Sequence, residues 1–210
     1  EAPMNHVTDP VPDDLEIWRA VRHRILRAAQ QVMGDFPQTR RSGPPKWSVL
    51  DEADCGSYLR QSISYEADQG CETTAFLCRP HDASRDPRPG VLCLHPTNGD
   101  QGYRDVVGLS GRANRNYASE LAEQGFVTIS PSYPLMAAYQ PNLGALGYKS
   151  GTMKAIWDNV RALDLLESFD FVAGSGFGAI GHSLGGHNSV YTAVFDPRIQ
   201  AVVSSCGLDS

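Results

Sequence analysis

The sequence lacks the features that would place the chain in a membrane or on nucleic acid. No apolar run approaches the roughly 18 residues that a membrane-spanning helix requires, and no secretory leader is recognisable. The formal net charge is −6, whereas a protein that binds a polyanion normally presents a basic face. We therefore expect a soluble protein with no nucleic-acid partner and no membrane span, either cytoplasmic or exported after loss of a leader.

The sequence also lacks the cysteine spacing that is typical of a zinc site. The chain has five cysteines, and none form the closely spaced pairs that ligate zinc. Cys93 and Cys206 lie inside apolar runs, which is typical of buried core thiols. Cys55, Cys71 and Cys78 lie in less regular sequence, where we expect at most one disulfide.

No repeat divides the chain, and 210 residues are enough for one sizeable domain. Apolar residues at helical spacing predict a helix over about 15–33, for which Asp13 and Asp14 supply the cap and a first-turn acid. Glycines and prolines then interrupt the pattern. We expect residues 1–45 to form a helical lead-in and residues 46–210 to form the main domain.

The main domain alternates between strand and helix patterns. An antiparallel pair joined by a turn at 66–70 is predicted at 58–65 and 73–79. Short apolar runs, typical of strands buried on both faces, follow at 91–94, 126–129, 177–180 and 199–205. The helices between them are predicted at 114–124, 152–169 and 184–195. This order predicts an α/β fold, with a mostly parallel sheet behind antiparallel N-terminal strands.

The last predicted strand, residues 199–205, is apolar and has no later strand beside it. An open hydrophobic edge promotes aggregation. We therefore expect either that the sequence is truncated at its C-terminus and lacks the last strands, or that another chain covers this edge.

One motif carries chemistry, the sequence GHSLG at 181–185 between a predicted strand and a predicted helix. A sharp strand-to-helix turn lifts a serine hydroxyl out of the sheet, and small residues on either side leave room for the strained backbone. The helix that follows directs its first amides toward an oxyanion. A five-residue match also arises by chance, but this context is the one that the motif requires. We predict Ser183 as nucleophile and the Leu184 amide as an oxyanion donor.

We call the strand-to-helix turn around Ser183 the elbow. The segment HPTNG at 95–99 follows the strand at 91–94, and enzymes with such an elbow place a second oxyanion donor at this position. Pro96 has no N–H, so the donor is the amide of Thr97 or, less favoured, that of Asn98. The alternative is an ordinary turn at the end of a strand.

Other polar motifs are assigned lesser roles. His182 is expected to orient the elbow, and His187 lies on the helix, poorly placed to accept the proton of the nucleophile. Residues 174–178 (GSGFG) loosely resemble a nucleotide loop, but they precede a strand rather than follow one, so we predict a turn. The aromatic-rich segment from Tyr133 to Tyr148 is either a surface loop or a wall of the substrate pocket, to which we also assign His95.

The remainder of a catalytic triad is missing. Enzymes of this type place the acid and then the histidine after the serine. Asp196 belongs to the turn that enters the last strand, at the wrong end of the sheet, whereas Asp209 lies just past that strand and can serve in a minority arrangement. No histidine follows His187. Because a serine without a base is weakly nucleophilic, either the base lies in further sequence or this polypeptide is inactive alone.

Together the motifs resemble the dienelactone-hydrolase-like and acetyl-xylan-esterase-like branch of the α/β-hydrolase superfamily. The likeness covers roughly residues 15–207, and besides the elbow it is carried by the segments 94–98, 108–114, 125–128, 130–134 and 150–158. It implies a serine hydrolase of carboxylic esters that needs no metal or cofactor, with Ser183, Leu184 and the loop after His95 in the roles given above. The chain departs from the family by stopping before the acid and histidine segments. Dienelactone hydrolases proper use cysteine, so the serine favours the esterase side.

We therefore predict acyl transfer through Ser183. Its hydroxyl attacks a small-molecule or carbohydrate ester, the amides of Leu184 and Thr97 hold the oxyanion, and water cleaves the acyl-enzyme. Two alternatives stay open, namely a catalytically inactive hydrolase-fold module or fragment, and a serine peptidase of the prolyl-peptidase type. The sequence does not predict the substrate or the size of its acyl group.

Overall fold

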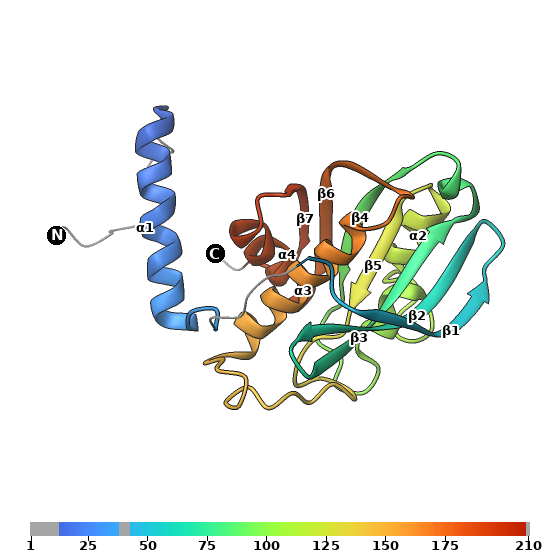
Figure 1. Ribbon diagram of the computed structural model, residues 1–210, viewed down its shortest axis with the longest axis horizontal. Coiled ribbons are helices and arrows are strands. Elements are labelled where there is room, and N and C mark those ends of the chain that lie inside the picture. The colour runs from blue at the N-terminus through green and yellow to red at the C-terminus, as the bar shows by residue number, and fades with distance from the viewer. Residues whose placement is uncertain (1–12, 38–42, 209–210) are drawn as a thin grey trace.

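Figure 1 shows a mixed sheet with helices on both faces. This computed structural model describes residues 13–37 and 43–208. The sheet has seven strands in the order β1-β2-β3-β5-β4-β6-β7. Their bounds are β1 Trp47–Asp54, β2 Tyr58–Asp68, β3 Cys71–Pro80, β4 Arg88–Leu94, β5 Val127–Pro131, β6 Val172–His182 and β7 Ile199–Ser205. The helices are α1 Leu15–Met33, α2 Tyr117–Glu123, α3 Gly151–Glu167 and α4 Leu184–Phe195, with 3-10 helices η1 His81–Ser84 and η2 Gly102–Val107.

Strand direction follows the predicted division. Strands β1, β2 and β3 form an antiparallel meander, and β3 also pairs antiparallel with β5. Strands β5, β4, β6 and β7 run parallel. The carboxyl ends of the parallel strands therefore meet at one edge of the sheet, where open α/β sheets bind their ligands.

Alternate side chains of β4 pack against the helices on opposite faces of the sheet. Val91 and Cys93 pack against η2 and α2 on one face, and Leu92 and Leu94 pack in the cluster that includes α3 and α4 on the other. Burying one such apolar side chain contributes about 1.5–3 kcal/mol. Because both faces of the central strands are covered, these strands read as continuous apolar runs.

Helix α3 is buried more completely than its apolar stripe predicts. Its N-cap Ser150 accepts a hydrogen bond from the Met153 amide at 3.2 Å, and every residue from Met153 to Leu166 is buried. A third apolar cluster covers its outer side and includes Met33, Phe36 and part of α4. Charged side chains of this helix therefore need partners inside the protein.

Helix α1 stands beside the sheet rather than on it (Figure 1). Asp14 caps it as predicted, accepting from the amides of Glu16 at 2.8 Å and Ile17 at 2.9 Å. None of its residues is buried, and Arg22 reaches the carbonyl of Val194 at 2.6 Å. Among the described residues, no helix has the length and apolar character needed to cross a membrane.

The structure corrects several details of the sequence prediction. Strand β1 was not predicted, and α2 begins at Tyr117 rather than at residue 114. The turn predicted at 174–178 is wrong, because these residues lie within β6. They form an irregularity there, since the pairs Arg88–Val172 and Gly90–Phe177 leave extra residues on β6. The open edge at β7 is confirmed, and six of its seven residues are exposed.

The cysteines also differ from expectation. All five are free thiols, so no disulfide joins Cys55, Cys71 or Cys78. Cys93 is buried as predicted, but Cys206 is exposed. The prediction for Cys206 is wrong because its apolar run belongs to the edge strand, which has one uncovered side.

Candidate active site

At the elbow, one residue, Ser183, separates the strand from the helix. Strand β6 ends at His182 and α4 begins at Leu184. Ser183 between them has φ 54° and ψ −121°, a conformation that side-chain-bearing residues rarely adopt. Its amide donates to the carbonyl of Ser205 at 2.7 Å, and its carbonyl accepts from the His187 amide at 3.0 Å. The strained turn is thus held by β7 on one side and by α4 on the other.

Glycine on both sides of Ser183 is a steric requirement. A Cβ at Gly185 would lie 1.9 Å from the Leu94 carbonyl oxygen, and one at Gly181 would lie 2.2 Å from the carbonyl carbon of Gly185. These are backbone atoms, which cannot move aside as a flexible side chain can. The contact with Leu94 also places the elbow against the end of β4, where the loop 95–99 begins.

The loop 95–99 is fixed by hydrogen bonds at both ends. His95 Nδ1 donates to the Pro96 carbonyl at 2.7 Å. Asn98 Oδ1 accepts from the amides of Asp100 at 3.2 Å and Gln101 at 3.0 Å, while its Nδ2 donates to the buried Asp105 carboxylate at 2.9 Å and 3.1 Å. The side chains of His95 and Asn98 therefore hold the shape of this loop.

The amides assigned to the oxyanion have no hydrogen-bond acceptor among the residues that the structure describes. Within the described part of the chain, neither the Thr97 N–H nor the Leu184 N–H makes a hydrogen bond, and the same holds for Asn98. Thr97 is exposed, and Leu184 opens α4, whose first amides have no intrahelical acceptor. Two free amides on adjoining elements can bind a negatively charged oxygen.

Neither histidine beside the elbow is placed as a base. His182 Nδ1 lies 3.0 Å from Ser205 Oγ, and Arg115 donates to its Nε2 at 3.4 Å. The ring of His187 packs edge-on against Tyr191, with centroids 4.4 Å apart. Among the described residues, no side chain hydrogen-bonds to Ser183 Oγ.

Of the two acids that follow the nucleophile, the structure describes only Asp196. Asp196 is buried and holds Arg198, with Oδ2 2.6 Å from Nη2. It lies in the turn that enters β7, as the sequence indicates. Asp209 lies outside the described residues. The acid of a triad is therefore not placed by the structure.

His95 and Tyr133, which were assigned to the substrate pocket, lie next to each other, with His95 buried and Tyr133 partly buried. The Tyr133 amide donates to His95 Nε2 at 3.1 Å, and burial lowers the pKa of His95. Both residues line a cavity of about 10 Å³ together with Asn159 and Asn188. That volume suits roughly one water molecule. The cavity is too small for an ester substrate.

The tyrosine-rich segment is anchored by a buried ion cluster that sequence reasoning missed. Lys154 has no exposed side-chain surface; it lies 2.7 Å from Asp68 and also pairs with Asp158. The hydroxyl of Tyr139 donates to Asp158 at 3.0 Å, and that of Tyr148 donates to Asp68 at 3.2 Å. The only signal in the sequence is the spacing of Lys154 and Asp158, which are four residues apart on a helix that proves to be buried.

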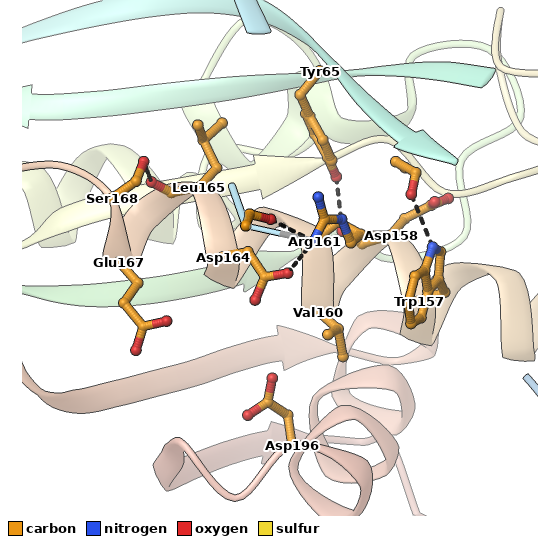
Figure 2. Close-up of polar contacts among 12 residues, drawn as sticks. Tyr65, Trp157, Asp158, Val160, Arg161, Asp164, Leu165, Glu167, Ser168 and Asp196 are labelled. Atoms are coloured by element: carbon orange, nitrogen blue, oxygen red, sulfur yellow. Dashed lines mark hydrogen bonds and ion pairs between the residues drawn. The ribbon is translucent and has the colours of Figure 1, made fainter. Parts of the chain in front are cut away.

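Further polar contacts hold α3 against its neighbours (Figure 2). The hydroxyl of Tyr65 donates to the Asp158 carbonyl at 3.0 Å, and Trp157 Nε1 donates to the Ala67 carbonyl at 2.8 Å. Arg161 pairs with Asp164 near the other end of the helix. The first two contacts join α3 to β2, so the helix beneath the tyrosine-rich segment has a fixed position.

The sheet order and the elbow define an α/β-hydrolase fold. Comparison with protein-family models and with curated proteins gives no match. Solved structures do match. A Bacteroides fragilis protein assigned as an acetyl xylan esterase has 16% identity and a TM-score of 0.70, with 92% of this chain and 54% of that one covered.

Two further esterases share the fold. A glucuronoyl esterase from Solibacter usitatus has 19% identity and a TM-score of 0.69, with 93% of this chain and 60% of that one covered. Acetyl xylan esterase 1 from Thermoanaerobacterium has 17% identity and a TM-score of 0.60, with 94% and 59% covered. The chain thus spans between 54% and 60% of the length of these three solved chains.

Proposed function

We propose that Ser183 is the nucleophile of a serine hydrolase that cleaves carboxylic esters through an acyl-enzyme. The observation that carries the proposal is the backbone of Ser183, strained at φ 54° between β6 and α4. Strain of this kind costs about 1–3 kcal/mol and is typical of functional sites. A serine used only for packing would not require it.

The surroundings of Ser183 support acyl transfer. Free amides at Leu184 and in the loop 95–99 suit the oxyanion of a tetrahedral intermediate, and each such donor is worth about 3 kcal/mol of barrier. The three solved structures named above are described as esterases. We take acetylated xylan and glucuronoyl esters as the first substrates to test.

Covalent labelling tests the proposal directly. Full-length protein treated with a fluorophosphonate should be modified once, at Ser183, and Ser183→Ala should remain unmodified. Turnover of p-nitrophenyl acetate should disappear in the same variant. If folded full-length protein is not labelled, the proposal fails.

A catalytically inactive hydrolase-fold module is the second candidate. The observation that favours it is the absence of any hydrogen bond to Ser183 Oγ from the described side chains. Ester turnover that depends on Ser183 would exclude this candidate. A parallel panel of peptide substrates separates the esterase from a peptidase with the same elbow.

A further inference from the structure

We propose that His95 is a positioning residue that aims the Thr97 amide at the oxyanion. This inference rests on the proposed function of Ser183 and assigns His95 a task distinct from lining a pocket. The residue would act through the peptide that joins Pro96 to Thr97, without touching the substrate.

The geometry of one peptide unit carries the inference. His95 Nδ1 lies 2.7 Å from the carbonyl oxygen of Pro96. That carbonyl and the N–H of Thr97 belong to the same planar trans peptide, in which C=O and N–H point in opposite directions. A side chain that fixes the carbonyl of Pro96 therefore also fixes the direction of the Thr97 N–H.

Two independent contacts require the same tautomer of His95. The carbonyl of Pro96 can only accept, so Nδ1 carries the proton. The amide of Tyr133 can only donate, at 3.1 Å, so Nε2 carries the lone pair. The residue is 3% exposed, and turning its ring over would break both bonds. The neutral ring is consequently locked in one orientation.

The locked ring also affects the strength of the donor. A hydrogen bond accepted by a carbonyl polarises its peptide, and in a buried environment such chains of hydrogen bonds reinforce one another. Asn98, bonded to Asp105 at 2.9 Å, fixes the other side of the same loop. The Thr97 N–H is thereby oriented before any ester binds, which is how oxyanion donors contribute most.

Two variants test whether His95 orients the Thr97 N–H or only joins the ends of two strands. His95→Asn places an amide nitrogen near the position of Nδ1, which keeps the donor to Pro96 and loses the acceptor for Tyr133. His95→Gln reaches the position of Nε2, which keeps that acceptor and loses the donor to Pro96. A residue that only joined two strand ends would tolerate or reject both changes alike.

The experiment compares fluorophosphonate labelling rates of the full-length protein and its variants. We expect His95→Gln to slow labelling by about 10- to 100-fold, approaching the loss of one oxyanion donor, and His95→Asn to remain within about fivefold of the wild type. The control is His81→Gln. His81 directly follows β3 and lies at the end of the sheet opposite to the elbow, and its side chain is 46% exposed and bonded to Asp54. This control should label at the wild-type rate.

The outcomes distinguish the two levels of the proposal. A wild type that is not labelled means that the proposed function is wrong. A labelled wild type whose Asn and Gln variants react at equal rates, with both shown to be folded by thermal unfolding, overturns the role of His95. Nitrogen-15 NMR of the wild-type imidazole gives an activity-independent check: a proton on Nδ1 is expected, and a proton on Nε2 overturns the inference.

Discussion

The backbone amide of Ser183 donates a hydrogen bond of 2.7 Å to the carbonyl oxygen of Ser205. The candidate nucleophile is thus joined directly to the last residue of β7. The side chain of Ser205 lies 3.0 Å from His182 Nδ1, so the same residue contacts the elbow twice. These contacts hold a backbone conformation that would otherwise relax.

The strain at Ser183 should be measurable as a stability difference. Ser183→Gly relieves the clash of a Cβ at φ 54°, so its free energy of unfolding should exceed that of Ser183→Ala by about 1 kcal/mol. Urea unfolding of the two variants gives this difference. Ser48 lies in the exposed strand β1, and there the order should reverse, with the glycine variant less stable by about 0.5–1 kcal/mol.

The close approach of Gly185 to β4 predicts a large loss on adding one methyl group. In Gly185→Ala the new Cβ meets the Leu94 carbonyl oxygen at 1.9 Å, and we expect a loss of about 3 kcal/mol or more in the free energy of unfolding. Gly174→Ala is the matched control, because no atom lies within 4 Å of its Cβ position. Similar stabilities of the two variants would contradict the tight packing of the elbow.

The pairing of Lys154 predicts that Lys154→Met is severely destabilising. The change leaves the carboxylates of Asp68 and Asp158 buried without their cation, which costs about 3–5 kcal/mol. Lys46→Met is the control, because the Lys46 side chain is 92% exposed and lies 3.9 Å from Glu66; it should cost at most about 1 kcal/mol. Hydrogen exchange should accelerate over residues 132–150 in Lys154→Met only.

The pH dependence of stability should reveal the burial of Asp158. Burial raises the pKa of this carboxyl to about 6 from a usual value of 3.8, against the opposing effect of Lys154. Since the folded state holds this proton more tightly than the unfolded state, the contribution to stability is full below pH 3.8 and is lost as pH rises through 6.

The comparison with Asp158→Asn isolates that group. Relative to this variant, the wild type should lose about 2–3 kcal/mol of unfolding free energy between pH 4 and pH 7. Denaturant titrations at several pH values measure the difference. A difference that stays constant or grows with pH would show that the carboxyl is ionised throughout.

Thiol reactivity should follow the burial of the cysteines. Cys206 is exposed, whereas burial raises the pKa of Cys78 to about 12 and that of Cys93 well above its usual range. A thiol reagent at neutral pH should therefore modify Cys206 first, and Cys78 and Cys93 only on unfolding. Mass spectrometry locates the adducts, and Cys206→Ser should remove the fastest phase.

Local patterns predicted most of the fold. Helix α4 and strand β7 have the bounds that the sequence indicated, and the elbow was recognised because all of its determinants lie within a few residues. Strand β1 escaped prediction because most of its residues are exposed and its structure comes from pairing with β2. An edge strand of this kind has little apolar patterning of its own.

The parts of the site that depend on distant contacts could not be predicted. Lys154 pairs with Asp68, which belongs to β2, and no local pattern indicates that pairing. The contact from His95 to Pro96 is between neighbours, but the bond from Tyr133 spans 38 positions. The ring proves to be locked only when the second contact and the burial are known beside the first.

The position of Cys206 provides a natural attachment point for an optical reporter. It directly follows Ser205, whose carbonyl oxygen holds the Ser183 amide, and its thiol is open to reagents. A fluorophore attached there would lie close to the elbow while leaving every residue from 181 to 185 unaltered. Changes in its emission would then report the binding of a substrate at Ser183 in real time, including substrates that give no coloured product.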